Sequence, residues 1–82
     1  MTDKLTQAKS TLSAVLDDTT VPRSIKVKVR KALEVFSSSE KTEALMIDQV
    51  LQDLDDITED PNTPSYTRTQ IWNIVSTLES TH

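Results

Sequence analysis

The chain has 82 residues, with 13 Asp and Glu against 9 Lys and Arg, a formal net charge of −4 at pH 7, and no cysteine or glycine. Without cysteine there is no disulfide, thiolate metal site or cysteine nucleophile, and without glycine there is no phosphate-binding glycine-rich loop, dinucleotide-binding turn or calcium loop. No stretch is apolar enough for a signal peptide or a membrane span, so we expect a cytoplasmic protein that does not enter the membrane.

Apolar residues recur at helical spacing along four successive stretches. We predict helices at about residues 3–18, 22–37, 40–58 and 64–80. Pro22 opens the second stretch, and Ser39 is a candidate cap for the third. The predicted core comprises Leu12, Leu16, Ile25, Val29, Phe36, Ile47, Leu51, Leu54, Ile71, Val75 and Leu78.

The stretch from Asp60 to Trp72 separates the third and fourth helices. Asp60 precedes a proline, which disfavours the helical conformation, so the third helix must end there. Thr63 can cap the fourth helix, with Pro64 at its first position, where a missing N–H costs nothing.

Four helices with short connections predict an all-α, up-and-down four-helix bundle that forms one domain over residues 1–82. A weak repeat indicates two similar helical hairpins. Leu16-Asp17-Asp18 precedes Pro22 as Leu54-Asp55-Asp56 precedes Pro64, with four more residues in the second loop. Five positions after the prolines match at equal offsets, namely Ile25/Thr67, Val29/Ile71, Ala32/Ile74, Leu33/Val75 and Phe36/Leu78.

The string DPNTPSYTRTQIWNIV at residues 60–75 resembles a block of one known family. These are small, functionally uncharacterised archaeal proteins, all helical, that share DPN-x-P…R-T-x-I-W-N-I-V. Residues 20–25, TVPRSI, resemble the first turn of the same family, whereas residues 37–42 depart from it. The resemblance implies a four-helix bundle in an intracellular archaeal setting, and it implies no activity.

No group of residues is typical of catalysis. The one histidine is His82, at the end of the chain, and no serine or threonine has a base at an interpretable spacing. A core this small leaves little room for a cleft in which carboxylates could act. We therefore predict that the protein is not an enzyme and has no catalytic residue, cofactor or metal ion.

Acidic residues gather at one end of the predicted bundle: Asp17, Asp18, Asp53, Asp55, Asp56, Glu59 and Asp60. One interpretation is a site for a divalent cation or a basic partner. The favoured one is that they approach the N-termini of the second and fourth helices and pair with Arg23 and Arg68.

The second helix is basic and holds Arg23, Lys26, Lys28, Arg30 and Lys31. The alternative function is therefore a nucleic-acid-associated protein that uses this face. We disfavour nucleic-acid binding because the net charge is negative and no aromatic residues alternate with the basic ones. The basic residues can also form ion pairs with the acidic third helix.

Trp72 lies beside the apolar stripe of the fourth helix. It either covers the rim of the core with Arg68 stacked on its ring, or anchors another chain together with Arg68 and Tyr66. The sequence thus predicts a small interaction or structural module, with Tyr66, Arg68 and Trp72 as contact residues. Its partner is an unknown protein or a second copy in a homodimer.

Overall fold

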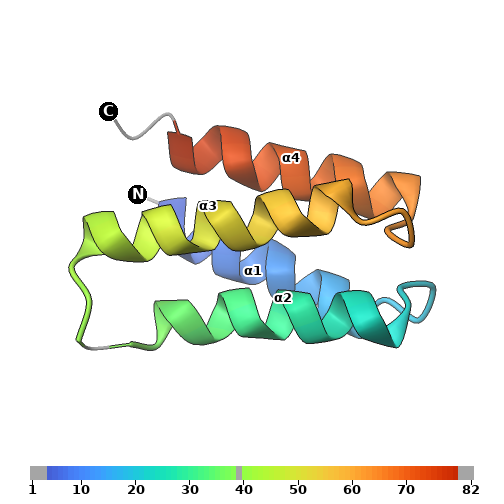
Figure 1. The fold of residues 1–82 in the computed structure, drawn as a ribbon, viewed down its shortest axis with the longest axis horizontal. Coiled ribbons are helices and arrows are strands. Elements are labelled where there is room, and N and C mark those ends of the chain that lie inside the picture. The colour runs from blue at the N-terminus through green and yellow to red at the C-terminus, as the bar shows by residue number, and fades with distance from the viewer. Residues whose placement is uncertain (1–3, 39, 80–82) are drawn as a thin grey trace.

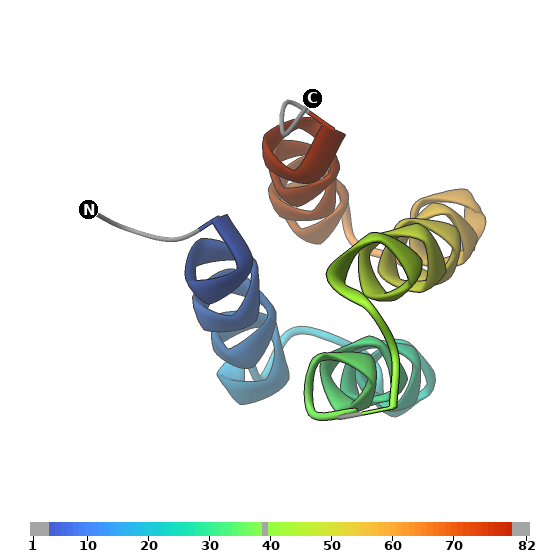
Figure 2. The same cartoon turned by 90° about the vertical axis from the view of Figure 1, so that its left-hand side faces the viewer.

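The computed structural model describes residues 4–38 and 40–79. These residues form four helices and no strand: α1 (Lys4–Asp17), α2 (Arg23–Phe36), α3 (Glu43–Glu59) and α4 (Ser65–Glu79). Successive helices run antiparallel (Figure 1), and each packs against the next, while α4 packs back against α1. The end view shows this ring, with α1 opposite α3 and α2 opposite α4 (Figure 2). The predicted all-α, up-and-down bundle is confirmed.

The two hairpins, α1–α2 and α3–α4, share one pattern of burial. Each buried residue from Ala8 to Phe36 has a buried counterpart 42 positions later, as Leu12 and Leu54 do. The pairs are Ala8 and Val50, Leu12 and Leu54, Val15 and Ile57, Val21 and Thr63, Ile25 and Thr67, Val29 and Ile71, Ala32 and Ile74, and Phe36 and Leu78. The hairpins therefore fill the bundle as two copies of one unit.

The loops within the two hairpins repeat the same hydrogen bonds. The carboxylate of Asp18 accepts from the N–H of Thr20 at 2.9 Å, and that of Asp60 accepts from the N–H of Asn62 at 2.9 Å. The Asp18 and Asp60 carbonyls accept from the N–H three residues later at 3.2 and 3.1 Å. Such turns, in which an aspartate side chain mimics a backbone turn, stop both helices in the same way.

The prediction that the second loop is four residues longer than the first is wrong. Asp55 and Asp56 lie within α3, which continues to Glu59, so they are not the counterparts of Asp17 and Asp18. The two loops have equal lengths. The prediction aligned the two hairpins on their Leu-Asp-Asp sequences, whereas the buried positions show that the correct offset is 42 residues throughout.

Three expected helix ends can be compared with the structure. Asp60 leaves the helical region (φ −73°, ψ 123°), as its proline neighbour requires. The Thr63 hydroxyl, expected to cap α4, instead donates to the carbonyl of Ile57 at 2.6 Å and satisfies the end of α3. The cap of α3 is Thr42, which accepts from Leu45 N–H at 3.2 Å. The predicted cap, Ser39, lies outside the described residues.

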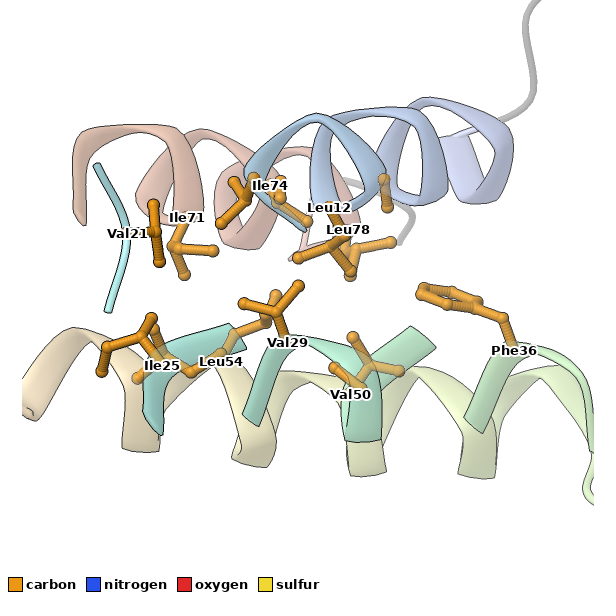
Figure 3. Close-up of a cluster of buried hydrophobic side chains, with 14 residues drawn as sticks. Leu12, Val21, Ile25, Val29, Phe36, Val50, Leu54, Ile71, Ile74 and Leu78 are labelled. Carbon is orange, nitrogen blue, oxygen red and sulfur yellow. The ribbon is translucent and has the colours of Figure 1, made fainter. Parts of the chain in front are cut away.

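The core lies along the axis between all four helices, and its side chains point toward one another (Figure 3). Seven predicted members are buried: Leu12, Ile25, Val29, Phe36, Leu54, Ile71 and Leu78. Leu16, Ile47, Leu51 and Val75 are only partly buried and pack against the core from its edges. They lie at the flanks of the apolar stripes rather than at their centres.

Candidate interaction surface

Trp72 is an exposed aromatic residue on a helix whose core face is complete without it. Its exposed fraction is 55%, whereas Ile71 is fully buried. Among the described residues, the other large apolar side chains that are strongly exposed are Leu45, Val27 and Tyr66. Trp72 is thus only partly buried, in agreement with its expected position beside the apolar stripe.

Tyr66 does not lie beside Trp72 on the surface of α4. Six residues along a helix rotate the side-chain direction by about 240°, so Tyr66 and Trp72 point about 120° apart. The sequence placed them together because they are close along the chain. Their helical positions separate them.

Arg68 is part of the turn between α3 and α4. Its Nε donates to the carbonyl of Thr58 at 3.0 Å, and its Nη2 donates to those of Asp60 and Thr63 at 3.2 and 3.3 Å. The prediction that Arg68 reaches the acidic loop is confirmed, but its partners are backbone carbonyls. No stacking of Arg68 on Trp72 is found among the described residues.

The hydrogen bond from Arg68 to the Thr58 carbonyl brings the start of α4 against the end of α3. Asp55 lies about one turn before Thr58, and Trp72 about one turn after Arg68. Because the helices are antiparallel, we infer that Asp55 lies near the level of Trp72. Asp48, Leu51 and Asp55 follow at helical spacing on one side of α3.

We define the Trp72 surface as exposed Trp72 with the exposed carboxylates Asp48, Asp55 and Glu59 and the partly buried Leu51. It combines one large aromatic side chain with an acidic rim. Neither spacing nor composition alone identifies this grouping, because it depends on the register between α3 and α4.

Three carboxylates in the second half of α3 and just after it form ion pairs with lysines of α2. Lys28 Nζ lies 2.9 Å from Asp60 and 3.1 Å from Asp56, and Lys31 Nζ lies 3.8 Å from Asp53. The expected pairing between the basic second helix and the acidic third helix is confirmed. The pairing of Arg23 with Asp17 or Asp18 is wrong, since among the described residues Arg23 has no such ion pair. The Asp18 carboxylate binds Thr20 instead.

The other side of α2 is a shallow hollow, which we call the α2 hollow. It has a volume of about 600 Å³ and is lined by Val21, Arg23, Lys26, Val27 and Arg30. Val21 is buried at its base, whereas Val27 has an exposed fraction of 59%. The three cationic side chains form no ion pair within the described residues.

A second hollow, of about 390 Å³, lies between α1 and α4. Its lining is uncharged and comprises Thr6, Gln7, Ala8, Ser10, Thr11, Asn73, Ile74 and Thr77. It contains no titratable side chain for acid–base chemistry. Within the described part of the chain, no group of three His, Cys, Asp or Glu residues is arranged to hold a metal ion. His82 lies outside the described residues.

Lys28 and Asp60 shift each other's pKa. The hydrogen bond from Lys28, helped by the N–H of Asn62, lowers the pKa of Asp60 below its ordinary value. The bonds to Asp60 and then Asp56 raise the pKa of Lys28. At the other loop, the Thr20 hydroxyl and then its N–H lower the pKa of Asp18.

These directions predict an acid-sensitive ion pair. Because the pKa of Asp60 is lower in the folded state, its stabilisation is present at neutral pH and is lost as the pH falls below about 4. We expect Lys28→Gln to lower the melting temperature at neutral pH, and to lose less stability than the wild type between about pH 6 and pH 3. Thermal melts followed by circular dichroism measure this. Lys41→Gln, an exposed control, should follow the wild-type profile. An equally steep acid profile for Lys28→Gln would contradict the assignment.

The sequence matches the model of an uncharacterised protein family (UPF0147) over residues 1–81. The chain belongs to this family. A UPF0147 protein of Methanocaldococcus jannaschii is 43% identical over 68 residues, which cover 83% of this chain and 73% of the relative. The expected membership in an uncharacterised family with archaeal members is therefore confirmed, whereas the shared block at residues 60–75 stays a prediction.

Two crystal structures share the UPF0147 fold seen here. The unknown-function protein MMP1188 superposes with a TM-score of 0.90 at 44% identity, covering 98% of this chain and 91% of that one. A UPF0147 protein from Thermoplasma acidophilum superposes with a TM-score of 0.88 at 26% identity, covering 96% and 93%. Neither description names an activity, a ligand or a partner.

In this UPF0147 protein, none of the described helices is long and apolar enough to cross a membrane. The cytoplasmic location expected from the sequence stays a prediction. So do the contact residues Tyr66, Arg68 and Trp72.

Proposed function

We propose that this protein is a non-catalytic interaction module that binds another protein through the Trp72 surface. The observation that carries the proposal is the exposure of Trp72 on a helix with a complete buried face. Tryptophan has a large apolar ring with one polar N–H, and it is enriched among the residues that dominate interface energies. The exposed carboxylates that helical spacing groups with it would supply the polar rim typical of protein interfaces.

The two other predicted contact residues have different places in this proposal. Arg68 supports the surface indirectly, because its three hydrogen bonds fix the start of α4 against the end of α3. Tyr66 lies on another side of α4, and its part in binding stays a prediction.

The alternative, nucleic-acid binding by α2, has weaker support. A basic helix that binds phosphates must present its cations to solvent. Lys28 and Lys31 instead face carboxylates of α3, where a phosphate backbone would meet like charges. Only the cations of the α2 hollow remain available.

Capture from a lysate of the organism that encodes the protein tests the proposal. Tagged wild type and Trp72→Ala are compared with Leu45→Ala, a control whose exposed fraction of 58% matches that of Trp72. We expect at least one protein that wild type and Leu45→Ala capture and that Trp72→Ala loses, because the tryptophan anchors the contact. Association should weaken by about 2 kcal/mol or more. If no captured protein distinguishes Trp72→Ala from Leu45→Ala, the proposal is wrong.

A further inference from the structure

The two hairpins carry opposite charges. Residues 4–38 contain seven Lys and Arg and three Asp and Glu, a net charge of +4. Residues 43–79 contain one Arg and eight Asp and Glu, a net charge of −7. The ion pairs of Lys28 and Lys31 with α3 use only part of this difference. Other charged side chains of the two hairpins, such as Arg30 and Asp55, are exposed to solvent.

The positive charge faces outward at the α2 hollow. Arg23, Lys26 and Arg30 surround exposed Val27 at helical spacing, above the buried Val21. The hollow therefore offers an apolar spot with a cationic rim.

The negative charge faces outward at the Trp72 surface, which has the inverse composition. Arg30 and Trp72 stand 42 positions apart, so they hold the same place in the two copies of the hairpin. The two hairpins face each other across the bundle axis (Figure 2). Because the two positions are equivalent in the two hairpins, we infer that the α2 hollow and the Trp72 surface lie on opposite sides of the molecule.

We propose that the partner of the Trp72 surface is a second copy of this chain, bound at its α2 hollow. This rests on the proposed function and names its partner. Trp72 of one copy contacts Val27 and Arg30 of the next, where an arginine over the indole adds a cation–π attraction. The acidic rim of the first copy meets Arg23 and Lys26 of the second. Because the two surfaces differ and lie on opposite sides, this contact is heterologous and can join more than two copies.

Sedimentation velocity on purified protein tests the inference. We expect wild type to associate with increasing concentration, and added salt to weaken the association by screening the charged rims. Trp72→Ala loses one surface, and the double variant Arg23→Glu/Arg30→Glu loses the other. Each variant alone should associate at least about tenfold more weakly than wild type. Leu45→Ala is the matched control and should associate like wild type.

Mixing the two variants gives the sharpest result. Trp72→Ala keeps its α2 hollow, and the double variant keeps its Trp72 surface, so the mixture should form a one-to-one heterodimer that neither variant forms alone. Circular dichroism must first show that both variants keep the helical fold. Where Trp72→Ala does not, Trp72→Gln replaces it in the same mixture.

Three results would overturn the inference. The first is a wild type that stays monomeric at low salt, and the second is a variant mixture that forms no complex. The third is binding of a short DNA duplex that Arg23→Glu/Arg30→Glu abolishes and Trp72→Ala leaves unchanged, without self-association, which would make the hollow a nucleic-acid surface. If wild type is monomeric but Trp72→Ala loses a captured protein, only the second-copy inference fails and the proposed function stands.

Discussion

Replacing Leu54 by alanine is expected to lower the free energy of unfolding by about 2–5 kcal/mol. Leu54 is fully buried on α3 and lies in the core cluster. Truncation removes apolar contacts and leaves a cavity that the surrounding helices fill only in part. Small proteins have a total stability of about 5–15 kcal/mol, so much of the variant would be unfolded or close to it.

Urea unfolding followed by circular dichroism measures this loss, and Leu51→Ala is the matched control. Leu51 lies one turn away on the same helix but is only partly buried. Its truncation should therefore cost clearly less. Equal losses for the two variants would contradict the placement of Leu54 inside the bundle and Leu51 at its edge.

Arg68→Ala is expected to destabilise the protein by about 2–3 kcal/mol. The substitution removes the donor to three carbonyls of the α3–α4 turn, those of Thr58, Asp60 and Thr63. Bonds from a charged donor are stronger than neutral ones, and partly buried carbonyls that lose a donor are costly. The start of α4 should loosen first.

Chemical denaturation of three variants separates this role from a charge effect. Arg68→Lys keeps the charge but lacks the planar group that reaches several carbonyls at once, so it should restore little stability. Arg30→Ala removes an exposed arginine without an ion pair in the described structure, and should change stability by about 0.5 kcal/mol or less. A full rescue by Arg68→Lys would show that charge, rather than the hydrogen bonds, matters.

Local sequence patterns predict this fold well because a helical bundle depends on local periodicity. The stripes that contain Leu12, Val29, Leu54 and Ile71 are visible without any tertiary information, and all four residues are buried. The end of α3 follows equally directly from Asp60 before Pro61. The apolar stripes do not define the exact centre of the buried face of each helix. Leu51 and Val75 were therefore predicted in the core but lie at its edge.

The surfaces depend on register between helices and are harder to predict. Arg23 and Asp18 are near in sequence, yet Asp18 closes its own turn, and the ion pairs instead connect Lys28 of α2 with Asp56 and Asp60 at the end of α3. To predict such ion pairs, one must know the register between the two helices. The Trp72 surface has the same origin, since its carboxylates come from α3 and its aromatic ring from α4.

The fluorescence of Trp72 tests the central claim most directly, because it is the only tryptophan in the chain. In dilute wild-type protein, the exposed indole should emit like tryptophan in water and be quenched readily by acrylamide. When protein concentration is raised at low salt, or a captured partner is added, binding at the Trp72 surface should shift the emission to the blue and protect it from the quencher. An association detected by sedimentation that leaves both the emission and the quenching unchanged would contradict the claim that Trp72 is at the interface.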